Sequence, residues 1–327
     1  MFLNNQHIKT HISKYKWSLF VILFLGVANS CITFLLAVSI GNFFSLRFND
    51  AGTKSKLLHD LGIYFGSYTY FVFFFCMLLV AKFVTHYFQQ SLGNLQGELF
   101  AKGIREKVFA AQINWEEETF RQKSFGNYLL RYSNDMKSVQ HYLVKGLMDG
   151  FRNVLFLLIG LTLIARINFG LSIIISFFLL TVSVLFFGLW KKQKVFISIS
   201  RDKRSSLLAF VTNQFGRFGR IKAGNQQVTI VQRFTEKSVA LYKANYVSVK
   251  NEGFIQGLIS ILPFLVTGLL MLLIFAELVN ISHTDAVTIV LIILMMQTPV
   301  KAILKIPGII AKGKISLHKI DELIDKK

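Results

Sequence analysis

Proline is rare in this sequence, and its rarity restricts what the middle of the chain can be. Only three of the 327 residues are proline, and the first of them is Pro263. Proline ends helices and favours turns, while long structureless stretches are uncommon in a compact domain. The interval from residue 82 to residue 253 is therefore expected to be helical.

Cysteine is scarce as well, and the residues present do not form a recognisable catalytic or metal site. The two cysteines, Cys31 and Cys76, each fall inside an apolar run, where cysteine behaves as a small apolar residue. The seven histidines are scattered, and no nucleophile, base and acid occur in a recognisable arrangement. We expect no catalytic residue, metal or cofactor on this chain itself.

Charged residues make up only 17% of the chain, against 53% hydrophobic residues and 33 phenylalanines, a composition typical of a membrane protein. The apolar residues gather in runs suited to a ~30 Å hydrocarbon core. The third run is short and needs the preceding turns, where Lys145, Asp149 and Arg152 can pair along one helix face. The six runs cover about residues 17–44, 61–81, 154–165, 170–190, 254–276 and 286–304.

Acidic residues are outnumbered by basic ones, 17 to 37, and the basic residues gather in alternate connections. Residues 191–252 hold thirteen Lys or Arg against three acids, and the tail from Lys301 holds seven Lys. Because Lys and Arg concentrate on the cytoplasmic side, we expect both termini in the cytoplasm. The net charge of +20 is then mostly a topology signal, and nucleic-acid binding is a poor interpretation of it.

Two long cytoplasmic connections, about 82–153 and 191–253, lie between runs two and three and between runs four and five. Their apolar residues keep helical spacing, so membrane helices are expected to continue outward, turn and return. The turns are predicted at residues 113–126, with three acids between Trp115 and Phe120, and at residues 214–226, where glycines alternate with aromatic and basic residues. Such tips suit protein docking, although solvated hairpin tips would look the same.

Several stretches resemble the transmembrane domains of ABC exporters. In FRQKSFGNYLLRYSND, an aromatic residue precedes a short loop, a glycine, an apolar pair, an arginine and an Asn-Asp pair. These are Phe120, Gly126, Leu129 with Leu130, Arg131, and Asn134 with Asp135. The stretch GRIKAGNQQVTIVQRFTEKSVALYKAN is similar to the second intracellular helix pair of the family, and IPGIIAKGKISLHKIDELID to its exit from the sixth span.

The resemblance implies that two coupling helices, at about 115–123 and 216–222, sit in grooves of nucleotide-binding domains. It also implies that the polar stretch 124–139 is a helix that returns through the cytosol. The residues expected to contact the partner ATPase are Trp115, Glu116, Glu117, Phe120, Arg121, Phe215, Phe218 and Arg220.

The resemblance further implies a second transmembrane half, as a homodimer or a heterodimer, and an integral position in the bacterial inner (plasma) membrane. ATP and Mg are expected on the partner nucleotide-binding domain. One motif in this chain could be mistaken for an ATP site: GIIAKGKI, residues 308–315, matches Gly-x-x-x-x-Gly-Lys but has Ile315 where Ser or Thr would bind magnesium. A membrane helix precedes it where a buried strand is needed, so we expect no ATPase site here.

Along the sixth span, Gln297, Lys301 and Lys305 recur every four residues and are predicted to share one helix face. In the family this helix helps to line the central cavity, so the three residues are candidates for the substrate path and would favour an anionic amphiphile. Lysines at the cytoplasmic end of a span also snorkel to lipid headgroups without any role in transport.

The expected fold is an all-α membrane protein with six transmembrane helices, long cytoplasmic helical extensions and two coupling helices, as in ABC exporters. Residues 1–16 would form a cytoplasmic segment, 17–310 the transmembrane domain, and 311–327 a tail toward a nucleotide-binding domain. The expected function is that of a permease subunit exporting an amphipathic lipid, peptide or drug-like substrate. An ion-coupled secondary carrier and a membrane-anchored scaffold or sensor remain as alternatives.

Overall fold

The computed structural model of the chain describes residues 6–48, 68–121, 125–275 and 283–325, and within them every regular element is a helix. Six of these helical segments are long and apolar enough to cross a membrane. The prediction of six spans is thereby confirmed. The parts of runs two and five that fall within 61–67 and 276–282 lie outside the described residues.

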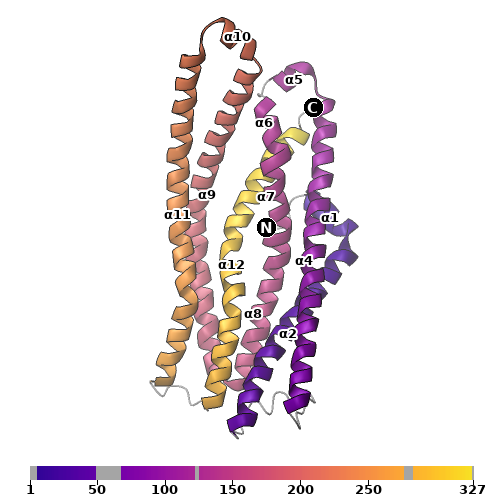
Figure 1. Cartoon of the computed structure of the whole chain (residues 1–327), viewed down its shortest axis with the longest axis vertical. Coiled ribbons are helices and arrows are strands. Elements are labelled where there is room, and N and C mark those ends of the chain that lie inside the picture. Colours follow the sequence, from indigo (N-terminus) through magenta and orange to yellow (C-terminus); the bar gives the residue numbers. More distant parts are fainter. Residues whose placement is uncertain (1–5, 49–67, 122–124, 276–282, 326–327) are drawn as a thin grey trace.

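The described part of the chain begins with a short helix, α1 (Gln6–Lys14), which was not predicted from the sequence. It is followed by the first span, α2 (Lys16–Phe48), and by α4 (Tyr68–Ile113), which runs alongside α2 (Figure 1). α4 has 46 residues and is about 70 Å long at 1.5 Å per residue, more than twice the thickness of a hydrocarbon core. The expected continuation of a membrane helix beyond the bilayer is therefore confirmed for α4.

The first hairpin consists of α4, a short helix at its far end, α5 (Glu117–Arg121), and a returning helical run that ends in the third span. Two π-helical segments interrupt the returning α-helical run. Its members are α6 (Phe125–Leu130), η1 (Arg131–Asp135), α7 (Met136–His141), η2 (Tyr142–Met148) and α8 (Asp149–Ile167). As predicted, the weak run 154–165 extends into the turns before it.

The second hairpin consists of α9 (Phe169–Phe215), a short helix α10 (Phe218–Ala223), and α11 (Gln227–Phe275). α9 starts at Asn168, whose side-chain oxygen accepts a hydrogen bond from the Leu171 backbone N–H at 3.0 Å and so caps the helix. In Figure 1, α10 and α5 lie at the same end of the molecule, each at the tip of its hairpin. The last helix, α12 (His283–Ile324), runs between the two hairpins.

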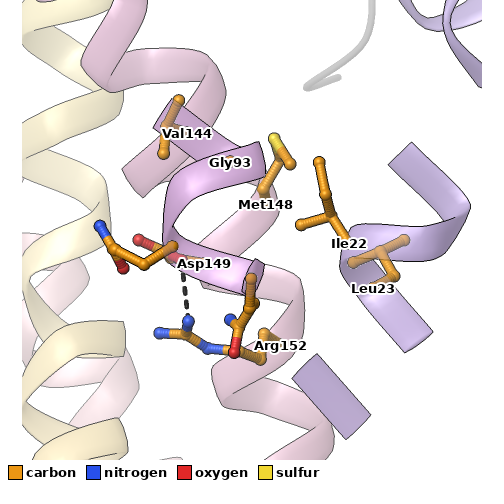
Figure 2. A pocket seen from close by; sticks show the side chains of 9 residues that line it. Ile22, Leu23, Gly93, Val144, Met148, Asp149 and Arg152 are labelled. Carbon is orange, nitrogen blue, oxygen red and sulfur yellow. Dashed lines mark ion pairs between the residues drawn. The ribbon is translucent and has the colours of Figure 1, made fainter. Parts of the chain in front are cut away.

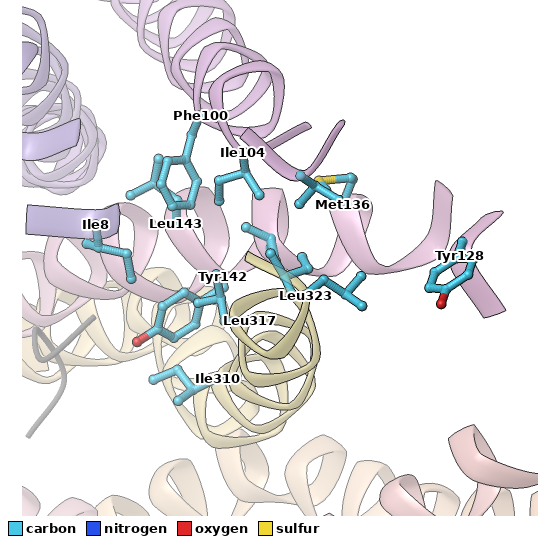
Figure 3. Close-up of a cluster of buried hydrophobic side chains, with 13 residues drawn as sticks. Ile8, Phe100, Ile104, Tyr128, Met136, Tyr142, Leu143, Ile310, Leu317 and Leu323 are labelled. Atoms are coloured by element: carbon cyan, nitrogen blue, oxygen red, sulfur yellow. The ribbon is translucent and has the colours of Figure 1, made fainter. Parts of the chain in front are cut away.

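Three clusters of buried apolar side chains hold these helices together. The first joins α1, α4, α6, α7, η2 and α12 near the hairpin tips, and Figure 3 shows Ile8, Phe100, Tyr142 and Leu317 converging there. The second joins the spans at the opposite end of the molecule, and the third joins α9, α11 and α12 around Trp190. Burial from water stabilises the cluster near the tips, whereas the clusters among the spans are stabilised mainly by van der Waals packing, because lipid is as apolar as the side chains.

Candidate functional site

The first tip, residues 115–121, has an inward side and an outward side. Trp115 and Phe120 both pack on Tyr128 of α6, with ring centroids 5.8 and 4.9 Å apart, and the Tyr128 hydroxyl donates a hydrogen bond to the Phe120 carbonyl at 3.0 Å. Glu116 and Glu117 are exposed. Trp115 therefore supports the tip from within, and the exposed carboxylates form the outer surface.

The second tip, residues 215–223, presents its predicted residues outward. Phe215 and Phe218 are 73% and 59% exposed, and Arg220 is exposed beside them. The Lys222 ammonium lies over the Phe218 ring, 6.0 Å from its centroid. Two exposed phenylalanines within a basic surface are unusual for a solvated tip and are typical of a docking surface.

The positions of the short helices agree with the predicted coupling helices to within a few residues. α5 begins at Glu117, where 115–123 was predicted, and α10 begins at Phe218, where 216–222 was predicted. Arg121 ends α5, but its side chain, like residues 122 and 123, lies outside the described residues. The two tips carry opposite charge, since the first exposes Glu116, Glu117 and Glu118 and the second exposes basic side chains.

The Gly-x-x-x-x-Gly-Lys pattern at 308–314 lies inside the continuous helix α12. A Cβ at Gly308 would overlap the indole ring of Trp190, and one at Gly313 would overlap the ring of Tyr142. These glycines therefore allow α12 to approach its neighbours closely. A phosphate-binding loop needs free backbone N–H groups, and a helix interior does not offer them.

The three residues predicted to form a stripe on α12, Gln297, Lys301 and Lys305, lie in different surroundings. Gln297 lines a small apolar pocket between α9, α11 and α12, together with Pro263 and Met296. Lys301 is half-buried and Lys305 is exposed. A spacing of four residues turns by about 40° per step on a helix of 3.6 residues per turn, so the three side chains follow a spiral rather than one line.

In the membrane half, two of the three charged residues predicted to pair along one helix face do so. The Arg152 guanidinium lies 3.2 Å from the Asp149 carboxylate (Figure 2). Lys145 is exposed and forms no part of this pair. The pair lies beside a pocket of about 10 Å³, against Gly26, where a Cβ would be 3.1 Å from the Arg152 side chain. A pocket of this volume is too small for a transport substrate.

The polar stretch 124–139 was expected to be polar because cytosol surrounds it, and this explanation is wrong for two of its residues. Asp135 is only 4% exposed, and it forms an ion pair with Arg131, whose side chain is also largely buried. The sequence did carry a signal for this burial. Asp135 stands four residues before Val139 and seven before Tyr142, both buried, so the three share one helix face.

His11 is a further buried polar group that sequence reasoning missed. It is 8% exposed, between Tyr15 and Phe100, with ring centroids 4.8 and 5.0 Å away. Burial lowers the pKa of His11, the nearby Gln96 side chain acts in the opposite direction, and the charge of Lys14 lowers the pKa further. The docked α1 therefore favours neutral His11.

Comparison with known proteins identifies the family of this fold. Residues 19–300 match the family described as the ABC transporter transmembrane region. The chain belongs to this family.

Relatives of this ABC transporter transmembrane chain include proteins whose names describe them as export ATP-binding/permease proteins. Those of Rickettsia typhi and Rickettsia conorii are 26% and 25% identical over 169 and 168 residues. Each alignment covers 51% of this chain and 29% of the relative, so the chain matches less than a third of their length. A solved structure of a bacterial Atm1-family ABC exporter with ATP bound has a TM-score of 0.78 at 13% identity, covering 97% of this chain and 54% of that one. This likeness shows the fold.

Proposed function

We propose that this ABC transporter transmembrane chain is the membrane-spanning half of an ATP-driven exporter, moved by a partner ATPase that docks on the tips of its two hairpins. Both termini and both tips would face the cytoplasm of a bacterium, with the chain in the inner membrane. The observation that carries the proposal is the pairing of α5 and α10 at one end of the molecule, each with exposed side chains suited to docking. The names of the relatives, export ATP-binding/permease proteins, support it.

The charges of the two tips indicate what the ATPase surfaces would be like. The first tip would fit a basic groove, because Glu116, Glu117 and Glu118 are exposed on it. The second would fit an acidic groove with an apolar pocket for Phe215 or Phe218. Charge complementarity of this kind sets partner choice and orientation more than affinity.

The ATPase would bind ATP and Mg and supply the driving force. This chain would supply rigid levers: α4, α9 and α11 have 46, 47 and 49 residues without a break in the helix. A displacement at a tip would therefore reach the spans as rigid-body reorientation, from inward-open to outward-open.

A second transmembrane half is proposed from an exposed apolar stripe on the distal half of α11. This part of α11 precedes the apolar run of residues 254–276, so water would surround it if nothing covered it. Exposed apolar stripes of this length mark interaction sites. The stripe consists of Val228, Val231, Val239, Tyr242, Tyr246 and Val249, all exposed and spaced to share one face.

The substrate class proposed is an amphipathic molecule such as a lipid, a peptide or a drug-like compound, with an anionic group favoured by Lys301 and Lys305. Substituting Lys305→Gln should weaken stimulation of ATP hydrolysis by an anionic amphiphile and leave stimulation by a neutral one unchanged. Equal effects on both would remove Lys305 from the substrate path.

The first test is purification of the tagged full-length protein from its native host in mild detergent, with mass spectrometry of what co-purifies. We expect a Walker-type ATPase, either as a separate subunit or as part of the same polypeptide. Recovery of the protein without an ATPase would contradict the proposal and favour a carrier or a scaffold.

A further inference from the structure

The second hairpin contacts the rest of the molecule in two regions along its length, one around Trp190 and one closer to the tips, and the kind of contact differs between them. Around Trp190, α9 and α11 share an apolar cluster with α12. Closer to the tips, the apolar cluster of Figure 3 is built from α1, α4, α6, α7, η2 and α12, with no side chain from α9 or α11 among its members. Among the described residues, the second hairpin meets the rest of the molecule at that level through a group of polar contacts and, nearer the tips, through the close packing of Gly126 in α6 on α9.

These polar contacts centre on the guanidinium of Arg201 in α9. One of its nitrogens donates to the Lys312 carbonyl at 3.0 Å and to the Ser316 hydroxyl at 2.7 Å, both in α12. The other nitrogen donates to the Ser138 hydroxyl of α7 at 2.9 Å. A single side chain of the second hairpin thus binds the first hairpin and α12 at once.

The same site holds a buried carboxylate that connects the partners of Arg201 with one another. The Ser316 hydroxyl donates to Asp135 at 2.7 Å, and Asp135 lies 3.7 Å from Arg201 and forms an ion pair with Arg131. We call Arg131, Asp135, Ser138, Arg201 and Ser316 the polar junction.

Two ion pairs flank the polar junction. Lys319 of α12 lies 2.9 Å from Asp202 of α9, and Lys312 of α12 lies 3.3 Å from Glu252 of α11. Both are partly exposed and contribute little by themselves. They bind the same two parts of the molecule, so they act in the same direction as Arg201.

The second hairpin has its own polar contacts between α9 and α11, which do not involve the polar junction. The Gln193 side chain donates to the Ser248 carbonyl at 3.1 Å and accepts from Asn251 at 2.6 Å, and Ser200 donates to Asn245. These bonds keep α9 and α11 paired if the polar junction opens.

A polar interface and an apolar interface differ in the free energy that is needed to separate them. An apolar core that is pulled apart exposes its surface to water at a cost that grows with area. Buried charges regain hydration when they separate, which offsets much of the lost attraction. Removal of one partner has the opposite consequence, because the remaining charge stays buried without compensation.

We infer that Arg201 is a positioning residue that fixes the second hairpin, and with it the second tip, relative to the first hairpin and α12. Loss of its guanidinium leaves Asp135, Ser138 and Ser316 without that partner. The packing of α6 on α9 at Gly126 is then the main remaining contact beyond Trp190, and when it opens the second hairpin swings as a unit about the apolar contacts at Trp190. The relevance of this motion to transport rests on the proposed function. The positioning itself does not, because it concerns distances within this chain.

The test uses the full-length protein in lipid nanodiscs, with Cys31 and Cys76 replaced by serine, and pulsed electron paramagnetic resonance. One pair of spin labels, at the exposed residues Lys102 of α4 and Lys243 of α11, measures the distance between the hairpins. A second pair, at the exposed residue Lys203 of α9 and at Lys243, measures the distance within the second hairpin.

For Arg201→Met we expect a second population of the distance between the hairpins, at least about tenfold larger than in the unsubstituted protein. The distance within the second hairpin should stay unchanged. Ser316→Ala removes less of the polar junction and should shift the same population in the same direction, which keeps the test usable if Arg201→Met folds poorly. Arg201→Lys should restore the distribution only in part, since lysine lacks the planar fork.

The matched control is Arg204→Met, one turn along α9 and exposed, which should leave both distances unchanged. Unchanged distances between the hairpins in Arg201→Met and Ser316→Ala would overturn the inference. So would broadening of both distances in both variants, because Arg201 would then stabilise the fold in general. No ATPase is needed, so these results stand apart from the fate of the proposed function.

Discussion

At Gly126 the return helix of the first hairpin touches the second hairpin without room for a side chain. A Cβ there would lie 2.7 Å from the Leu208 carbonyl oxygen and would overlap the Thr212 side chain. Because a backbone carbonyl cannot move aside as a side chain can, α6 would have to shift away from α9.

We therefore expect Gly126→Ala to lower the free energy of unfolding by about 1–3 kcal/mol, measured as the thermal midpoint in detergent. The matched control is Gly103→Ala in α4, where nothing lies within 4 Å of the added Cβ. That change should be neutral or stabilising by about 0.5–1 kcal/mol, since alanine suits a helix better than glycine. Equal midpoints for the two variants would contradict this account of Gly126.

Trp190 contacts α12 next to a proline inside the helix. Its indole N–H donates to the Leu304 carbonyl at 2.6 Å, three residues before Pro307, and its ring lies against Gly308. Trp190→Phe should cost about 1 kcal/mol, because the buried hydrogen bond from the indole N–H to the Leu304 carbonyl is lost. Trp17→Phe, at a residue that is 74% exposed, should have little effect. A thermal midpoint as low for Trp17→Phe as for Trp190→Phe would show that the hydrogen bond is not the cause.

At the scale of elements, α1 is the helix whose attachment depends on pH. Docking buries His11 and lowers its pKa below the ordinary value of 6.5. Docked α1 therefore binds fewer protons than undocked α1 between the lowered pKa and 6.5, so docking weakens as pH falls through that window and is unaffected above it.

Hydrogen exchange of residues 6–14, corrected for the intrinsic pH dependence, should accordingly be faster at pH 5.5 than at pH 7.5. His11→Phe keeps the ring contacts with Tyr15 and Phe100 and removes the titration, so its exchange should not depend on pH in this range. His7, in the same helix, lies 3.2 Å from Asp321 and is unchanged in this variant. A pH dependence that persists in His11→Phe would show that His11 is not its cause.

The elements that the sequence predicted best are those with a long repeating signal. The six spans follow from apolar length and the hairpins from helical spacing without proline, because both signals add up over many residues. The helix α1 and the π-helical segments η1 and η2 were missed, since they depend on a few contacts with distant parts of the chain.

The candidate site was predictable only in part, for a similar reason. Exposed residues such as Phe218 and Arg220 follow from the composition of a turn. The inward position of Trp115 and the burial of Asp135 do not, because each depends on which neighbour the returning helix meets. Arg201 gave no signal at all: one arginine among thirteen basic residues in 191–252 looks like part of a solvated surface.

At the scale of the whole molecule, the exposed stripe on α11 predicts association with a second transmembrane half. Tyr242→Glu places a charge in the middle of the stripe and should reduce the dimeric fraction about tenfold or more, measured by mass photometry in detergent. Arg233→Glu, an exposed change on the opposite side of the same helix, should leave the dimeric fraction nearly unchanged. Dimers that survive Tyr242→Glu at full level would place the contact with the second half elsewhere.

The central claim is that an ATPase docks on the hairpin tips, and photo-cross-linking from the second tip tests it most directly. Phe218 is replaced by benzoylphenylalanine, the protein is irradiated with its ATPase present, and cross-linked peptides are identified by mass spectrometry. Phe169, 70% exposed at the opposite end of α9, is replaced in the same way as the control. The account predicts cross-links to the ATPase from position 218 and none from position 169. Absence of ATPase peptides at position 218, or equal yields at both positions, would contradict it.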